Sequence, residues 1–205
     1  MSQLTAMPPP DASGASSAPT EQPRVAPELF RAAVDSLNRT RVRDEVRVEP
    51  MRPPQRLAPW SYAVSADIRD ANGDEVATGR LVLLHDPDGE PAWGGVLRLV
   101  AYASADVDPD MARDPLLPNV GWSWLIDSLA ERGAEHTASG GTVTQTTSTR
   151  FGDLAGPGTT TTLELRGSWT PRTGDLEPHL RAFADLLANA VGLPPEGVTA
   201  LTRGR

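Results

Sequence analysis

The sequence predicts an α+β domain in which a mainly antiparallel sheet of about six strands packs against three helices. Segments that alternate apolar and polar residues are joined by short turns rich in Gly, Asn and Asp, as in antiparallel hairpins. Segments with apolar residues at helical spacing stand before, between and after these strands. The predicted order is α-β-β-β-β-α-β-β-α, which favours α+β over a doubly wound parallel sheet.

The 205 residues suffice for one domain with tails. Residues 1–26 are rich in Pro, Ala and Ser and have almost no large apolar side chains after Met7, which is typical of a disordered tail. We therefore expect a single α+β domain over residues 27–194 and a short C-terminal tail over residues 195–205.

The first half of the domain contains one helix and three strands. The helix is expected over residues 27–40, since Pro is favoured at a first helical position and the following apolar residues recur at helical spacing. A short strand over residues 45–48 follows. The strand at residues 61–69 alternates clearly, and Asn72-Gly73 then forms a hairpin turn. The return strand at residues 76–85 is apolar on both faces near its centre, so we expect it to be central.

The second half of the domain contains three strands and two helices. A buried strand is expected over residues 95–105, followed by a helix that begins near Asn119 and ends near Gly133. A Thr-rich strand over residues 142–151 and a strand ending at Trp169 come next. The last helix is expected over residues 175–190, before Gly and Pro residues that terminate it.

The composition excludes several kinds of chemistry. The chain has no Cys, no Lys and only three His. A P-loop and a Schiff base need Lys, and a cysteine nucleophile or a disulfide needs Cys, so none of these is available. We expect no cofactor. The absence of disulfides, of a signal-like N-terminus and of an apolar run long enough to cross a bilayer predicts a cytoplasmic protein without a membrane partner.

The formal net charge of −8 argues against a general nucleic-acid surface, because neutralising phosphates requires clustered basic side chains. The local exception is a basic stretch that begins with Arg39, Arg41 and Arg43. These three residues are candidates for binding an acidic partner or for contacts with the acidic remainder of the same domain. The Asp and Glu residues interleaved with them favour the intramolecular interpretation.

A polar turn after the central strand contains the only candidates for catalysis. His85, Asp86 and Asp88 combine an imidazole with carboxylates that acid–base chemistry needs. A transition metal prefers several His or Cys side chains held on rigid elements, so we expect no metal site. A polar hairpin tip is the simpler interpretation of the same residues.

Two tryptophans on the second predicted helix point in different directions. Trp122 and Trp124 are separated by about 200° around a helix, so they cannot both face one core. One should be buried and the other should meet a second surface. Trp124 lies off the apolar stripe and is the candidate for a partner-binding face, although packing on the core or the sheet edge is the simpler interpretation.

Over about residues 27–201 the chain resembles an actinobacterial family known as domain of unknown function three thousand. The runs that carry the resemblance include Leu29-Phe-Arg-Ala-Ala-Val, Asp86-Pro-Asp-Gly-Glu-Pro-Ala-Trp93 and Trp122-Ser-Trp-Leu. The resemblance implies a cytoplasmic protein without established activity and supplies no catalytic residues. The order of elements is also similar to the secretion-chaperone-like sandwich, which has one strand fewer. That similarity implies binding of partner segments and dimerisation through the second helix.

Three hypotheses for function follow. The leading one is a non-catalytic, chaperone-like module that binds a ligand, an unknown protein partner or a second copy of itself. The alternative is a small-molecule enzyme that uses carboxylates and His85. A weaker alternative is an accessory to an RNA-processing partner through the basic stretch. The inventory of side chains favours binding over catalysis.

Overall fold

The computed structural model describes residues 25–154 and 158–196. In this part of the chain there are three α-helices: α1 (Glu28–Arg39), α2 (Leu117–Glu131) and α3 (Glu177–Ala190). The strands are β1 (Arg47–Met51), β2 (Trp60–Arg69), β3 (Glu75–Glu90), β4 (Gly95–Asp106), β5 (His136–Thr149) and β6 (Thr159–Pro171). Two 3-10 turns are η1 (Met111–Arg113) and η2 (Gly152–Leu154). This order confirms the predicted α+β class and the predicted sequence of elements.

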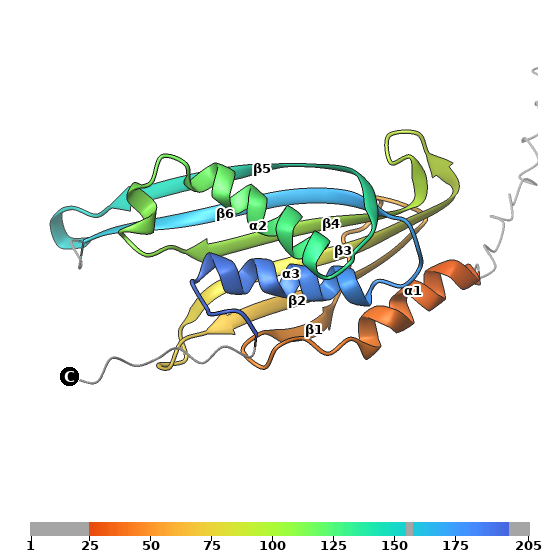
Figure 1. Ribbon diagram of the computed structural model, residues 1–205, viewed down its shortest axis with the longest axis horizontal. Coiled ribbons are helices and arrows are strands. Elements are labelled where there is room, and N and C mark those ends of the chain that lie inside the picture. Colours follow the sequence, from red (N-terminus) through yellow and green to blue (C-terminus); the bar gives the residue numbers. More distant parts are fainter. Residues whose placement is uncertain (1–24, 155–157, 197–205) are drawn as a thin grey trace, which may run out of the picture.

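The six described strands form one sheet in the order β1-β2-β3-β4-β6-β5, and every neighbouring pair is antiparallel. The three helices cover one face of this sheet, with α3 over its middle and α2 over β5 and β6 (Figure 1). α2 connects β4 to β5, and these two strands are not neighbours in the sheet. β6 lies between them and pairs with both.

Two strands are longer than the sequence pattern predicts. β3 continues to Glu90, beyond the expected end at residue 85, because its hairpin with β4 resumes pairing at Glu90 and Gly95 after a register shift. β5 begins at His136 rather than at residue 142. A second register shift between Thr137 and Gly140 interrupts the alternation there, which hides the start of the strand in the sequence.

The core lies between the sheet and the helices. Its largest fully buried side chains are Trp169 on β6 and Phe183 on α3, surrounded by leucines from β3, β4 and α2. Gly79 of β3 lets α3 approach the sheet, since a Cβ at that position would lie 2.6 Å from Cζ of Phe183. Close packing of α3 on the centre of the sheet therefore depends on a glycine.

The other face of the sheet is polar over its central rows. Ser65, Arg80, Tyr102 and Arg166 lie side by side on four neighbouring strands. The Arg166 guanidinium lies 5.5 Å from the centroid of the Tyr102 ring. A small apolar cluster on this face, centred on Val82, packs against residues of the β1–β2 and β3–β4 connections.

A buried hydrogen bond joins β6 to α3. Nε1 of Trp169 donates to Nδ1 of His179 over 3.0 Å, so His179 accepts at Nδ1 and is neutral in this arrangement. Burial, and to a smaller extent electrostatic repulsion from His136, lowers the pKa of His179 to about 4, while Asp175 opposes the shift. Protonation of His179 at Nδ1 would remove the acceptor and point its N–H at the N–H of Trp169, which breaks this hydrogen bond.

Acid is therefore expected to destabilise the fold through His179. The unfolded chain binds this proton near pH 6.5, but the folded protein binds it only near pH 4. Between these values the unfolded state holds more protons, so the free energy of unfolding falls as the pH falls from 6.5 toward 4. The total loss from this residue is roughly 3 kcal/mol.

Urea unfolding across this pH range measures the effect. His179→Gln keeps an acceptor for Trp169 but removes the titrating ring, so its free energy of unfolding should depend less steeply on pH than that of the wild type. Equal slopes for the two proteins would contradict the assignment.

Candidate functional site

The structure separates the three candidates for catalysis. His85 lies on the helix-facing side of β3 and is buried, with its ring stacked on Phe30 of α1 at a centroid distance of 6.0 Å. Its Nδ1 lies 2.9 Å from the carbonyl oxygen of Val96, which assigns the ring proton to Nδ1. Nε2 is buried and has no hydrogen-bond partner among the described residues. His85 is thus part of the packing between β3 and α1.

Asp86 and Asp88 lie in the β3–β4 hairpin beyond His85. The Asp88 amide donates to Oδ1 of Asp86 over 3.0 Å in the last part of β3, where the pairing with β4 is irregular. The expectation of a polar hairpin tip at these residues is wrong in position, because β3 continues to Glu90 and the turn follows at residues 91–94. The side chain of His85 points into the core from the same strand.

The basic stretch divides between solvent and the domain itself. Arg39 and Arg41 are exposed, whereas Arg43 is buried. The Arg43 guanidinium donates to both carboxylate oxygens of Glu45, at 3.2 and 3.1 Å, and to the carbonyl oxygen of Pro194 at 3.0 Å. For Arg43 the contacts are therefore intramolecular and hold the chain after α3 against the α1–β1 connection.

Both tryptophans of α2 are half-buried, so neither takes the fully buried place that the helical spacing predicted for one of them. Trp124 packs against the main core and the small cluster around Val107 and Leu117. Trp122 lies over β5 and β6, where its Cζ3 is 2.7 Å from the place of a Cβ on Gly141. The absence of a side chain at Gly141 makes room for the indole of Trp122. The helix can therefore pack both tryptophans on the same domain.

A pocket opens where two neighbouring strands separate. The pairing of β4 with β6 begins only at Leu99 and Trp169, whereas the earlier part of β4 pairs with β3 alone. The end of β6 pairs with β5 instead, through Thr170 and Pro171. The resulting gap is a cavity of about 320 Å³, which is within the range of small-ligand sites.

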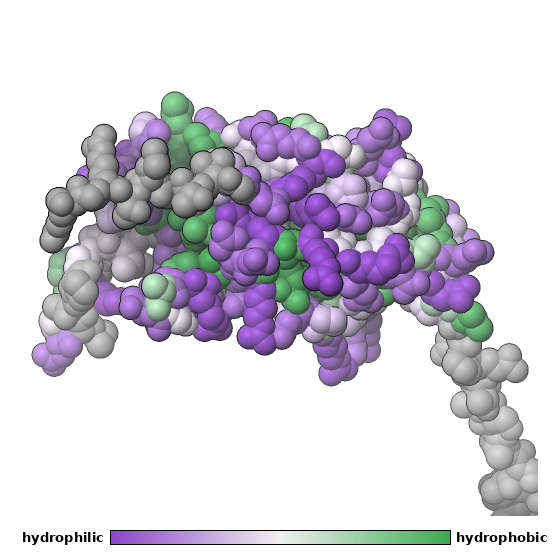
Figure 2. Space-filling model, turned by 60° about the horizontal axis from the view of Figure 1, so that its bottom comes forward, coloured by the Kyte–Doolittle hydropathy of each residue, from purple (hydrophilic) through white to green (hydrophobic). Residues whose placement is uncertain are grey.

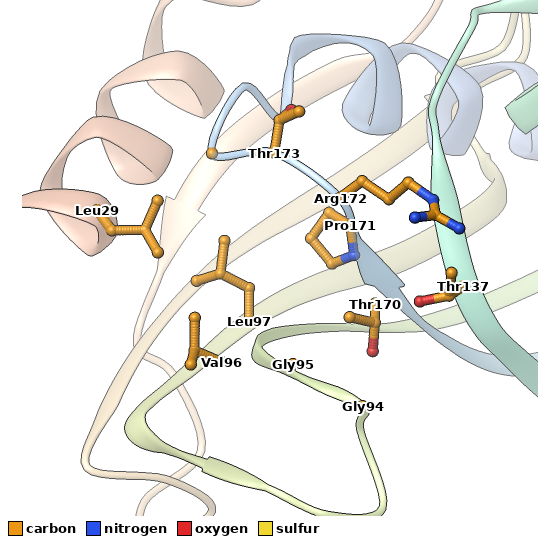
Figure 3. Close-up of a pocket in the computed structure, with 11 residues that line it drawn as sticks. Leu29, Gly94, Gly95, Val96, Leu97, Thr137, Thr170, Pro171, Arg172 and Thr173 are labelled. Carbon is orange, nitrogen blue, oxygen red and sulfur yellow. The ribbon is translucent and has the colours of Figure 1, made fainter.

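The pocket has an apolar side and a polar side (Figure 3). Leu29 points from α1 toward Val96 and Leu97 of β4, while Arg172 extends from the end of β6 toward Thr137 (Figure 3). Gly174 lets the segment after β6 approach Leu29 closely, because a Cβ at this position would lie 2.9 Å from Cδ1 of Leu29. The remaining lining residues are Gly94, Gly95, Thr170, Pro171 and Thr173.

One arginine, Arg172, lines the pocket, and a second, Arg98, follows the lining residue Leu97 on β4. Arg98 is not in the lining; it points to the other face of β4 from Leu97 and donates to three neutral acceptors: Oγ1 of Thr170 at 3.0 Å, Oγ of Ser168 at 2.6 Å and the carbonyl oxygen of Ala138 at 2.9 Å. Among the residues described, neither Arg98 nor Arg172 forms an ion pair. In a chain of net charge −8, the unpaired guanidinium group of Arg172 in the lining of the pocket favours an anion.

Sequence reasoning missed this pocket. Its walls come from four segments that are distant in the chain: the start of α1, the start of β4, the start of β5 and the segment after β6. The Gly94-Gly95 pair and the Thr-Pro-Arg-Thr-Gly run at residues 170–174 were the available signals, because small and turn-forming residues after a strand often border ligand sites.

The described residues contain no group of three or more His, Asp or Glu side chains placed to hold a metal ion. None of the helices in that part of the chain is long and apolar enough to span a membrane.

Comparison with known proteins gives one match. No curated protein and no solved structure matches the chain. A family model described as a protein of unknown function, DUF3000, matches residues 26–199, which include every helix and strand described above and the whole pocket. The chain belongs to the DUF3000 family.

Proposed function

We propose that this protein is a non-catalytic binding module whose pocket between α1, β4 and β6 takes an amphipathic anion. The observation that supports this most directly is the gap in the sheet, with the unpaired Arg172 on one side and aliphatic side chains on the other. Such a ligand is a carboxylate with an apolar body. It is either a free organic acid or the carboxyl-terminal residue of a partner polypeptide, which would be the chaperone-like form of this function.

The chemistry of the lining favours binding over catalysis. The side chains that border the cavity are aliphatic, hydroxyl or guanidinium groups, and His, Asp and Glu are not among them. Acid–base catalysis near neutral pH needs a group that exchanges a proton there, which guanidinium and threonine hydroxyl groups do not do. Both kinds of group donate hydrogen bonds to anions, and Arg172 extends toward Thr137 in the lining (Figure 3).

Isothermal titration of the full chain with matched probes tests this function. Octanoate should bind and octylamine should not, because the two share an apolar tail and differ in charge. A pentapeptide that ends in leucine, with either a free carboxylate or a carboxamide terminus, then separates the two sources of ligand. Binding of octanoate alone identifies a free acid, and binding of the free-acid peptide over its amide identifies a polypeptide end. If none of the probes binds, the proposal fails.

Arg172→Gln is expected to weaken binding of the carboxylate probe by about threefold to tenfold, since an exposed charged hydrogen bond is worth about 1 kcal/mol. The fold should be unaffected because Arg172 is exposed. Arg113→Gln is the matched control, as Arg113 is exposed on η1, which follows the opposite end of β4. Equal affinities for Arg172→Gln and the control would show that the pocket is not the binding site.

A further inference from the structure

The two edges of the sheet differ in how they are protected. β1 is a five-residue edge strand that carries the Arg47–Glu49 ion pair and contains Pro50, which has no amide hydrogen to offer. Charges, proline and short length are the usual devices that keep an edge strand from pairing with another chain. Figure 2 brings the lower side of Figure 1 forward, where β1 lies, and shows mainly hydrophilic residues with separate hydrophobic patches.

β5, the other edge, has none of these devices along most of its length. It has 14 residues, none of which is Asp, Glu, Lys, Arg or Pro. Its single register shift lies near the start, between Thr137 and Gly140, and from there to Thr149 the strand pairs with β6 without a break. Among the described strands, β5 has a neighbour on one side only. Its outer backbone groups are therefore a regular template for a further strand.

The helix above this edge also lacks charge on the side that overhangs it. Pro118, Trp122 and Ile126 recur every fourth residue on α2 and are half-buried, and Trp122 rests on Gly141 of β5. Glu131 of α2 lies on the opposite flank, where it borders a cavity with Asp185 of α3. Asp127, four residues earlier, is on the same side by helical spacing. The α2 flank beside β5 therefore adds partly exposed apolar surface to the uncharged strand edge.

We infer that β5 pairs antiparallel with β5 of a second copy of this chain and joins two sheets into one. In such a pair, a two-fold axis normal to the sheet places residues from the same face opposite each other. A charged strand would meet its own charges there, whereas β5 presents Thr to Thr. The same pairing already occurs inside the chain, where the hydroxyl groups of Thr147 and Thr161 lie 3.2 Å apart.

A second copy also explains the charge distribution and the helix flank. Each chain carries a net charge of −8, so association is least opposed where charged side chains are fewest. The β5 edge meets this condition, and pairing there brings the two copies of the Pro118, Trp122 and Ile126 flank toward each other across the axis. Burial of these side chains adds apolar contact to the main-chain hydrogen bonds.

Sedimentation velocity of the full chain over a wide concentration range tests this interface. The wild type should be a dimer, and the double variants Thr144→Lys/Thr146→Lys and Thr144→Glu/Thr146→Glu should each be monomers, because both positions are exposed on β5. We expect each to weaken dimerisation by at least about tenfold. An equimolar mixture of the two variants should regain the dimer mass, since opposite charges then meet across the pair.

Thr78→Lys is the matched control, because Thr78 lies on the open face of the sheet in the interior strand β3. It should remain a dimer. The lysine variant reduces the magnitude of the net charge, so loss of its dimer follows from the position of the new charges and not from overall repulsion. A monomeric wild type, or dimers that persist in both double variants with native circular dichroism spectra, would overturn the inference. If the wild type is a monomer, the β5 edge would instead be a candidate site for an extended segment of another protein.

Discussion

Replacing Phe183 with alanine is expected to lower the free energy of unfolding by about 3–5 kcal/mol, the usual cost of removing a fully buried phenyl ring. Phe183 lies on α3 against the middle of the sheet, where its ring approaches Gly79 of β3. The surrounding strands are held in register by their neighbours, so they have little freedom to collapse into the space left behind. Since a domain of this size is stable by only about 5–15 kcal/mol, the change is large.

Chemical denaturation with urea measures this loss. Phe151→Ala is the matched control, because the same substitution there removes a side chain that is 79% exposed. The control should change the free energy of unfolding by less than about 0.5 kcal/mol. A loss below about 1 kcal/mol for Phe183→Ala would mean that α3 does not pack on the sheet as described.

Gly79→Ala is expected to cost about 2–3 kcal/mol because it overpacks the same contact from the other side. The new methyl group would lie 2.6 Å from Cζ of Phe183 and 2.9 Å from the carbonyl oxygen of Tyr102. The ring can turn aside, but the backbone oxygen of the paired strand β4 cannot move without loss of pairing. Gly140→Ala in β5 is the control, since its Cβ would have no neighbour within 4 Å.

The two positions should be coupled. Phe183→Leu shortens the side chain that the new methyl group meets, so the cost of Gly79→Ala should be smaller in the Phe183→Leu background than in the wild type. A double-mutant cycle of unfolding free energies measures this difference. Strict additivity would show that the strain of Gly79→Ala arises at Tyr102 or Leu187 and not at Phe183.

The local pattern of the chain predicted its elements well. Hairpin signals such as Asn72-Gly73 and the alternation in β2 depend on neighbours in the sequence, and the structure has both the turn and the strand. The boundaries were less accurate where a register shift breaks the alternation, as between Thr137 and Gly140 in β5. The pairing partner supplies the regularity that the sequence lacks at such a bulge.

The local sequence predicted the candidate site less well than it predicted the helices and strands. His85 ends an apolar run and precedes three acidic residues, so its neighbours suggested a polar hairpin. Its burial follows from α1, since Phe30 lies 55 residues earlier in the sequence and stacks on the ring. The pocket likewise exists because β4 and β6 are not paired at one end, and no local sequence pattern encodes where their pairing stops.

By itself, the sequence determined the α+β class, the order of helices and strands, and the exclusion of lysine and cysteine chemistry, because these depend on composition and on periodicity within single elements. The tertiary structure decided which strands became edges, where the sheet splits and which side chains line the split. β6 pairs with β4 although α2 and β5 separate the two strands in the sequence. Contacts between segments so distant in the chain are set by packing of the whole domain.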